Sequence, residues 1–174
     1  YHSKLDISKA LDISLMNVTR GVRELEELGL LVTRQKGRSS MVTMSMEREA
    51  LLAKAKSYLR NPVQKRLYVK AEDWILALPK AGKEAKLVRS DSGKKKDSLG
   101  HNVRAIEKRV YLNCADTMVT IDPAWDTEEA YIELEVWRYD PTRFTDKHTV
   151  DSISLSLSFM GEDENALELN INQL

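Results

Sequence analysis

A run of residues that begins at Ser14 carries side chains that can read base edges in duplex DNA. Asn pairs in bidentate fashion with adenine and Arg with guanine. A recognition helix presents such residues at its N-terminal end, where it enters the major groove. We predict that double-stranded DNA contacts the following residues of the run: Ser14, Met16, Asn17, Thr19, Arg20 and Arg23.

The order of charges along this run indicates an anionic partner. Residues 14–23 contain two arginines and no acid, whereas Glu24, Glu26 and Glu27 follow in the C-terminal turns. The helix macrodipole favours the reverse order, by about 0.3–1 kcal/mol per charge. An arrangement that opposes helix stability suggests that the N-terminal end faces a polyanion. The alternative is a solvated helix face with incidental arginines.

Two helices joined by a tight turn are expected to position the run. The pattern predicts helices over residues 4–11 and 14–28, with Asp12 and Ile13 in the turn. Ser8 supplies a small side chain where the helices cross, and Ser14 is a favoured N-cap. An apolar wedge is expected from Ile7, Leu11 and Ile13, and a buried stripe from Val18, Val22, Leu25 and Leu28.

A basic hairpin is predicted directly after the second helix. Gly29 suits the end of that helix because glycine tolerates the left-handed conformation. Strands are expected over residues 30–33 and 41–44, in a wing that spans residues 32–44. The tip of the hairpin carries three cations and no acid: Arg34, Lys36 and Arg38. Such a tip suits phosphates or the minor groove, and an ordinary charged turn is the alternative.

Residues 3–45 resemble winged helix-turn-helix transcriptional regulators of the MarR-like kind. The resemblance rests on residues 7–14, on Val18-Thr19-Arg20 and on residues 23–30. It implies a bacterial regulator such as a repressor, with a DNA-binding domain over residues 1–46 and a homodimer on DNA. Such domains have another helix before the pair, and only three residues precede it here. We therefore expect that N-terminal residues are missing or that another chain supplies the packing.

The distribution of charge suggests two parts with different partners. The 174 residues have no net charge, but residues 1–70 hold 14 Lys and Arg against 7 Asp and Glu. Residues 113–174 hold 3 against 14. Such asymmetry is typical of a nucleic-acid-binding part joined to something else, and two ordinary domains of opposite surface charge are the alternative. No apolar run approaches the roughly 18 residues that span a membrane.

Neither a catalytic site nor a metal site is predicted. Cys114 is the only cysteine, so no disulfide forms within the chain, and a reducing, cytoplasmic compartment is expected. His2, His101 and His148 lack the spacing of metal ligands. We therefore predict that the chain is not an enzyme and uses no cofactor.

A second, β-rich domain is predicted over residues 62–174. Asn61 precedes a proline and marks the boundary, after a linker helix over residues 47–61. Strands are expected over 63–69, 103–112, 117–121, 130–139 and 150–159, a mobile basic loop over 89–98 and a short terminal helix over 162–170. The predicted fold class is α+β: an N-terminal winged helix-turn-helix joined by a helix to a β-rich α+β domain.

The strand over residues 130–139 carries a candidate face for a ligand or a protein partner. Alternation puts Ile132, Leu134 and Val136 on one face of the strand. The candidate residues lie on the other face: Tyr131, Glu133, Glu135 and Trp137, followed by Tyr139. Paired carboxylates among aromatic rings suit a cation, a basic protein or a small-molecule effector, and a half-exposed structural strand is at least as consistent. A metal nuclease is disfavoured, because the set Asp122, Glu133, Glu135 and Asp140 is a poor one.

Segments of the second domain also resemble antitoxins of the type IV abortive-infection systems. The resemblance rests on residues 62–69, 134–141 and 150–155. Such antitoxins place a winged helix before a second domain and repress their own operon. Two functions follow. The first is a sequence-specific transcriptional regulator that reads the major groove with helix 14–28 and the phosphates or minor groove with wing 32–44. The alternative is an autoregulating antitoxin whose C-terminal domain neutralises a partner toxin.

Overall fold

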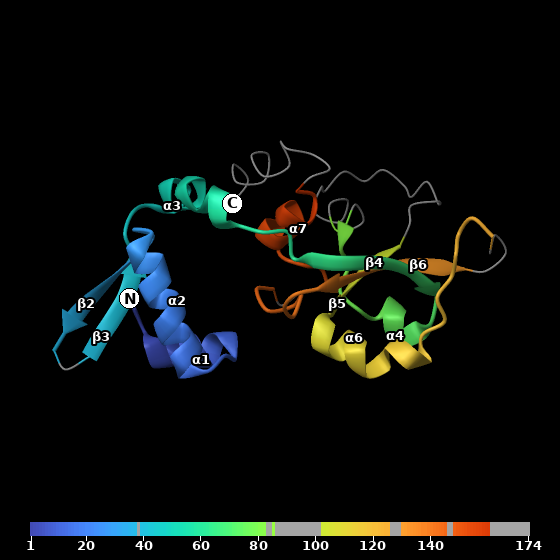
Figure 1. The fold of residues 1–174 in the computed structure, drawn as a ribbon, viewed down its shortest axis with the longest axis horizontal. Helices are drawn as coiled ribbons and strands as arrows, with labels where there is room; N and C mark the ends of the chain where they lie inside the picture. Colours follow the sequence, from blue (N-terminus) through green and yellow to red (C-terminus); the bar gives the residue numbers. More distant parts are fainter. Residues whose placement is uncertain (38, 83–84, 86–101, 126–129, 146–147, 161–174) are drawn as a thin grey trace. The chain divides into compact units, whose positions relative to one another are not determined.

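In the computed structural model the chain forms two compact units, Tyr1–Leu59 (unit 1) and Arg60–Leu174 (unit 2) (Figure 1). The structure describes residues 1–37, 39–82, 85, 102–125, 130–145 and 148–160. These residues form helices and two small sheets of three strands each, so the predicted α+β class is confirmed. The division between the units falls within the range predicted as the linker.

Unit 1 contains two helices joined by the turn that the sequence predicted. The helices are α1 (Lys4–Leu11) and α2 (Leu15–Glu27). Between them, Asp12 adopts the left-handed conformation with φ 47°. The Ser8 hydroxyl donates to the Ile13 carbonyl at 2.6 Å, and the Ile13 amide donates to the Ser8 carbonyl at 3.2 Å. Ser8 therefore stabilises the turn through hydrogen bonds, in addition to supplying a small side chain where the helices cross.

A hairpin follows α2, and the first strand of the chain joins it. Gly29 ends the helix with φ 66°, as predicted. The strands are β1 (His2–Ser3), β2 (Leu31–Lys36) and β3 (Ser39–Met44), in the antiparallel order β1-β3-β2. The pairing of β1 with β3 ties the start of α1 to the hairpin.

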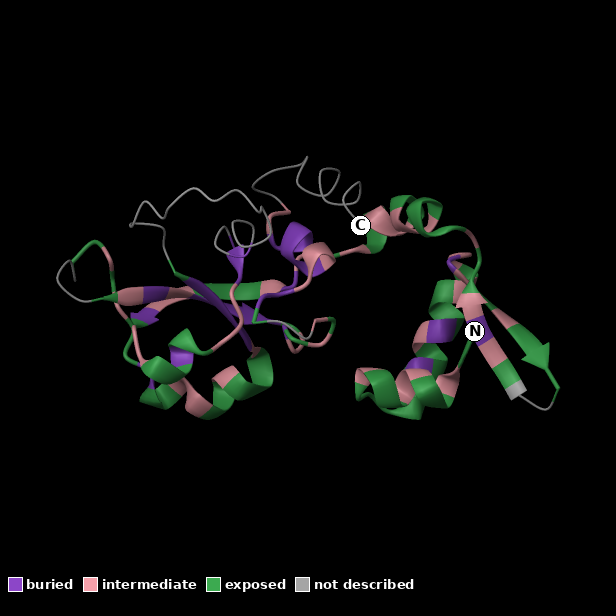
Figure 2. Ribbon diagram, turned by 180° about the vertical axis from the view of Figure 1, so that it is seen from behind, coloured by how far each residue is buried: buried purple, intermediate pink, exposed green. Residues whose placement is uncertain are grey.

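Unit 1 has a small hydrophobic core. Its buried members are Val18, Val22 and Val42, with Ile7 and Leu31 packed against them. No residue of α1 is buried (Figure 2). The core therefore consists of one face of α2 laid against the sheet.

The predicted apolar stripe of α2 is buried only in part. Val18 and Val22 are buried, but Leu25 is 38% exposed. Ile13, which was expected in the wedge, is also exposed. The prediction of these two as core residues is wrong, because the stripe assumes a further layer of packing. A core of three valines does not reach far enough to cover them.

The predicted linker helix is divided into α3 (Arg48–Ala55) and the 3-10 turn η1 (Lys56–Tyr58). Two side chains tie this region to the end of α2. Ser45 Oγ donates to the Gly29 carbonyl at 2.6 Å, and Lys54 Nζ donates to the same oxygen at 3.3 Å. These bonds explain why α3 groups with unit 1 and is not a free spacer.

Unit 2 is built on the strands β4 (Val63–Lys70), β6 (Tyr131–Trp137) and β5 (Val103–Glu107), in that spatial order. β4 is antiparallel to β6, and β5 is parallel to it. Short segments pair with both outer strands. The Ile121 amide donates to the Tyr68 carbonyl beside β4, and the Ala105 amide of β5 donates to the Pro79 carbonyl.

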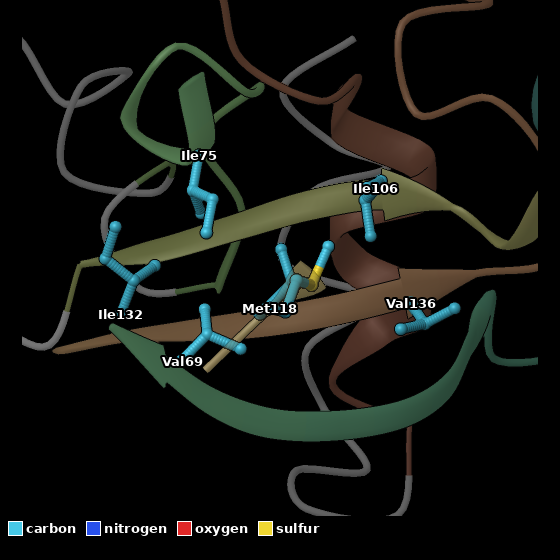
Figure 3. Close-up of a cluster of buried hydrophobic side chains, with 7 residues drawn as sticks. Val69, Ile75, Ile106, Met118, Ile132 and Val136 are labelled. Atoms are coloured by element: carbon cyan, nitrogen blue, oxygen red, sulfur yellow. The ribbon is translucent and has the colours of Figure 1, made fainter. Parts of the chain in front are cut away.

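Helices cover both faces of this sheet (Figure 1). On one face lie α4 (Asp73–Leu76) and α6 (Lys108–Cys114), and on the other lies α7 (Ser152–Ser158). The first face is filled by a cluster of buried side chains (Figure 3): Val69, Ile75, Ile106, Met118, Ile132, Leu134 and Val136. The second face is filled by another cluster: Ala81, Ala85, Val103, Ala105, Trp137, Val150 and Leu155.

Three of the predicted strands differ in the structure. The strand predicted over 103–112 ends at Glu107, where α6 begins. The strand predicted over 117–121 is reduced to one bridge between Thr120 and Val69, after the 3-10 turn η2 (Ala115–Thr117). The strand predicted over 150–159 is α7. The strands over 63–69 and 130–139 are confirmed, whereas the loop over 89–98 and the helix over 162–170 lie outside the described residues.

Ser156 and Ser158 of α7 can be buried in a helix because carbonyls of the same helix accept from their hydroxyls. Asp151 caps it, since its Oδ1 accepts from the Ser154 amide at 2.9 Å. Ser156 Oγ donates to the Ser152 carbonyl, and Ser158 Oγ donates to the Leu155 carbonyl, both at 2.7 Å. All residues from 154 to 158 are buried. The alternation therefore did not separate a buried face from an exposed one, and the two-residue period predicted the wrong element.

Candidate nucleic-acid interface

The face of α2 that points away from the core of unit 1 is exposed. Val18 and Val22, each 4% exposed, hold the opposite face of the helix against the sheet. Met16 is 69% exposed, and the other predicted contacts on this helix are also exposed: Asn17, Thr19, Arg20 and Arg23. An open depression along this face is lined by Leu15, Met16, Thr19, Arg20, Arg23, Glu24 and Glu27.

The N-termini of the two helices differ in charge. In α1, Ser3 and Asp6 form a capping box in which each side chain accepts from the backbone amide of the other. In α2, Ser14 Oγ accepts from the Asn17 amide at 3.2 Å, and the first turn contains no acid. Asn17 thus occupies the position that the acid occupies in α1. The partial positive charge at the start of α2 is not offset by a carboxylate of its first turn.

Hydrogen bonds divide the exposed polar residues of α2 into two groups. Thr19 Oγ1 donates to the Leu15 carbonyl at 2.8 Å, and Arg23 Nε donates to Glu27 Oε1 at 3.1 Å. The side chains of Asn17 and Arg20 make no hydrogen bond or ion pair with any residue in the described part of the chain. Their donors are therefore available for an external acceptor.

The hairpin presents part of the predicted basic tip. Arg34 and Lys36 are exposed on β2, and Arg34 Nη1 donates to the Tyr1 hydroxyl at 3.5 Å. Gly37 turns the hairpin with φ 63°, and its carbonyl accepts from Gln35 Nε2 at 3.3 Å. Arg38, the third predicted cation, lies outside the described residues.

The candidate face of β6 is largely buried. Glu135 is 2% exposed, and Trp137 is fully buried. Glu135 Oε2 accepts from Trp137 Nε1 at 3.0 Å, and its Oε1 accepts from Arg66 Nε at 3.1 Å. The idea that this face is open to a ligand or protein is therefore wrong at these two residues, because α7 covers it. The carboxylate does bind a cation, but that cation is Arg66 of the same sheet.

The outer part of this face is also held by the fold. Glu133 Oε1 lies 3.7 Å from Arg66 Nε. The ring of Tyr131, which is half-buried, packs edge-on against Tyr68 with 5.6 Å between the ring centroids. Sequence reasoning missed Arg66, although its alternation with Tyr68 on β4 places both on one face of the sheet.

Burial sets the electrostatics of Glu135. Removal from water raises the pKa of its carboxyl above the usual value, and the hydrogen bond from Trp137 and the charge of Arg66 oppose that rise. Arg66 also donates to the Ser158 carbonyl at 3.0 Å, so the network joins the sheet to the end of α7. Both oxygens of Glu135 are used within the fold, which indicates a structural role.

The remaining acids of the disfavoured nuclease set act in turns. Asp122 Oδ1 accepts from the Ala124 amide at 3.0 Å, and Asp140 Oδ1 accepts from the Thr142 amide at 2.8 Å. Among the described residues, no three His, Cys, Asp or Glu side chains gather closely enough to hold a metal ion. In the same part of the chain, every helix is too short or too polar to cross a bilayer.

Comparison with known proteins yields no relative. The chain matches no protein-family model, no curated protein and no solved structure. Its function therefore has to be argued from the geometry of its own residues.

Proposed function

We propose that the chain is a sequence-specific DNA-binding regulator of transcription, in which unit 1 acts as a winged helix-turn-helix. In this proposal α2 enters the major groove by its N-terminal end. The hairpin of β2 and β3 is the wing and lies along phosphates or in the minor groove. α1 and the turn at Asp12 set the angle at which α2 is presented.

One observation carries the proposal. Asn17 and Arg20 stand exposed on the acid-free half of α2, and their side chains are not engaged by any described residue. They are the two residue types that pair in bidentate fashion with adenine and guanine edges. The opposite face of the same helix is buried on Val18 and Val22, so the helix backbone that carries them is held in place.

The charges of unit 1 also support double-stranded DNA as the partner. The start of α2 has a capping serine in place of a capping box with an acid, which leaves it attractive to phosphate. Arg34 and Lys36 add exposed positive charge on the hairpin. Phosphate contacts from such residues position a protein on DNA, and contacts to base edges supply the specificity.

Selection of bound sequences tests the proposal. The 174-residue chain is incubated with a pool of random duplexes, and the bound fraction is amplified and sequenced. We expect an enriched motif, and a repeated, inverted motif is expected if the protein binds as a homodimer. The variant Asn17→Ala/Arg20→Ala is expected to lose the enrichment, whereas Arg48→Ala, which removes an exposed arginine on α3, is expected to retain it. Equal recovery of all sequences by the unaltered chain would contradict the proposal.

A further inference from the structure

The strand pairing of unit 2 gathers three segments at one end of its sheet. β4 begins there and β5 and β6 end there, since Val63 and Glu107 are both register partners of Trp137. The residues that flank this end are rich in cations. We call the following set the basic end: Arg60, Lys65, Lys108, Arg109 and Arg138.

Contacts join the segments of the basic end. Lys65 Nζ donates to the Tyr111 hydroxyl at 3.3 Å and lies 5.5 Å from the centroid of its ring, which links β4 to α6. Arg138 Nε donates to the Asn61 carbonyl at 3.4 Å, which links the end of β6 to the start of the unit. The basic end therefore draws on residues that are far apart in the sequence.

The cations of this surface are exposed, and two of them are unpaired within the described residues. All five are exposed, and Lys108 and Arg109 make no ion pair or hydrogen bond through their side chains within the described residues. The acids next to the set in the chain, Glu107 and Asp140, are half-buried. Asp140 is engaged by the amide and the hydroxyl of Thr142.

Helix stability does not explain the position of Lys108 and Arg109. Both lie at the start of α6, after the N-cap residue Glu107, which makes no side-chain cap hydrogen bond, and the first turn of this helix has no acid. A cation at that place opposes the helix macrodipole.

We propose that the basic end is a second phosphate-binding surface that contacts the backbone of the same duplex that α2 reads. This inference rests on the proposed function. Arg60 is the first residue of unit 2, so chain connectivity places the basic end next to the segment that joins it to unit 1. Contacts of this kind carry no sequence information and strengthen binding to every duplex.

The test compares the 174-residue chain with its Lys108→Ala/Arg109→Ala variant. Dissociation constants are measured by fluorescence anisotropy over a range of salt concentrations, on a selected duplex and on a random one. We expect weaker binding to both duplexes by the same factor. The slope of log affinity against log salt should become shallower by about 2, one for each lost phosphate contact. The midpoint of thermal unfolding should not fall, because the substitution removes two cations that are unfavourable at the start of α6.

A matched pair of single substitutions controls for charge alone. Arg109→Ala and Lys70→Ala each remove one exposed cation. Lys70 makes an interaction within the fold and lies at the opposite end of the same sheet, opposite Tyr131. Arg109→Ala is expected to make the salt slope shallower, and Lys70→Ala is expected to leave it unchanged.

The experiment distinguishes failure of this inference from failure of the proposed function. If the unaltered chain binds a selected duplex and the double variant binds it with the same affinity and salt slope, the basic end has no role in DNA binding and the inference is overturned alone. A loss confined to the selected duplex would also overturn it, because it would indicate contacts to bases. If the unaltered chain ignores duplex DNA, the proposed function fails, and the inference fails with it.

Discussion

Arg20 and Arg23 on α2 differ in whether their side chains are already paired with a described residue. Arg23 is paired with Glu27 four residues later, an exposed ion pair of the kind that contributes little to stability. Arg20, one turn before it, has no such partner among the described residues. Both arginines have a glutamate four residues later, Glu24 for Arg20 and Glu27 for Arg23, and only Arg23 is paired with its own.

Arg20→Ala is expected to weaken binding to a selected duplex by roughly 1–3 kcal/mol, because a bidentate contact to a base is lost. Binding to random DNA should change little. Competition titrations with both duplexes measure the difference, and Arg48→Ala, which removes an exposed arginine on α3, serves as the control. Equal losses on the two duplexes would show that Arg20 contacts only phosphate.

Glu135 is a residue whose surroundings change the pH dependence of stability. Burial raises the pKa of its carboxyl above the ordinary value of 4.5, against the opposing effects of Trp137 and Arg66. A raised pKa favours the folded state at low pH, where the group is neutral. That contribution is lost as the pH rises through the raised pKa.

Glu135→Gln is therefore expected to gain stability relative to the unaltered chain as the pH rises from below 4.5 towards neutrality. The glutamine still offers an acceptor to the Trp137 indole. Denaturant unfolding at a series of pH values measures the effect, and Glu107→Gln, which lies outside this network, corrects for the change in net charge. A stability difference that does not vary with pH would argue against an ionised, desolvated carboxylate at this position.

At the scale of elements, the start of α2 combines a stabilising cap with a surface for an anion. Ser14→Ala is expected to destabilise unit 1 by about 1 kcal/mol, because the cap to the Asn17 amide is lost. Ser14→Asp restores a cap and complements the macrodipole, so it should recover the stability. The aspartate also sets a carboxylate against DNA phosphates, so binding should fall.

Thermal unfolding and DNA affinity, measured on both variants, separate the two roles of Ser14. Stability and affinity are expected to move in opposite directions in Ser14→Asp. If DNA affinity followed stability in both variants, the N-terminal end of α2 would not face the duplex.

A substitution in the hairpin is expected to change DNA affinity in a different way from a substitution in α2. Lys36 is exposed near the tip of β2, and a contact from it to phosphate is independent of sequence. Lys36→Ala is expected to weaken binding equally on selected and random duplexes and to make the salt slope shallower by about 1. Anisotropy titrations at several salt concentrations measure it. An affinity that barely depends on salt in the unaltered chain would contradict a basic wing.

The elements of unit 1 were predictable because their signals are local. Ser14, Asp12 and Gly29 mark helix ends through hydrogen bonds or left-handed backbone within a few residues. The same local rules failed in unit 2. The strand predicted over 103–112 ran across Glu107-Lys108-Arg109, the charged residues at which β5 ends and α6 begins. The alternation in α7 suits a strand as well as it suits a buried helix whose serine hydroxyls bond to its own carbonyls.

At the scale of the whole molecule, the net charge of zero conceals two basic surfaces, one in unit 1 and the other the basic end of unit 2. The excess of cations in residues 1–70 is divided between unit 1 and the first strand of unit 2. Strand pairing then collects Lys65 with Arg138 and the start of α6 at one end of the sheet. The charge counts pointed to the first surface, and only the sheet register revealed the second.

The sequence by itself determined the helix pair, the turn at Asp12, the hairpin and the exposed residues of α2, because caps, glycines and a helical apolar period act over short distances. The tertiary structure decided the burial of Glu135 and Trp137, the exposure of Leu25 and the composition of the basic end. The physical reason is that burial and proximity depend on what packs from elsewhere in the chain. α7 covers one face of the unit 2 sheet, whereas the core of unit 1 leaves part of α2 uncovered.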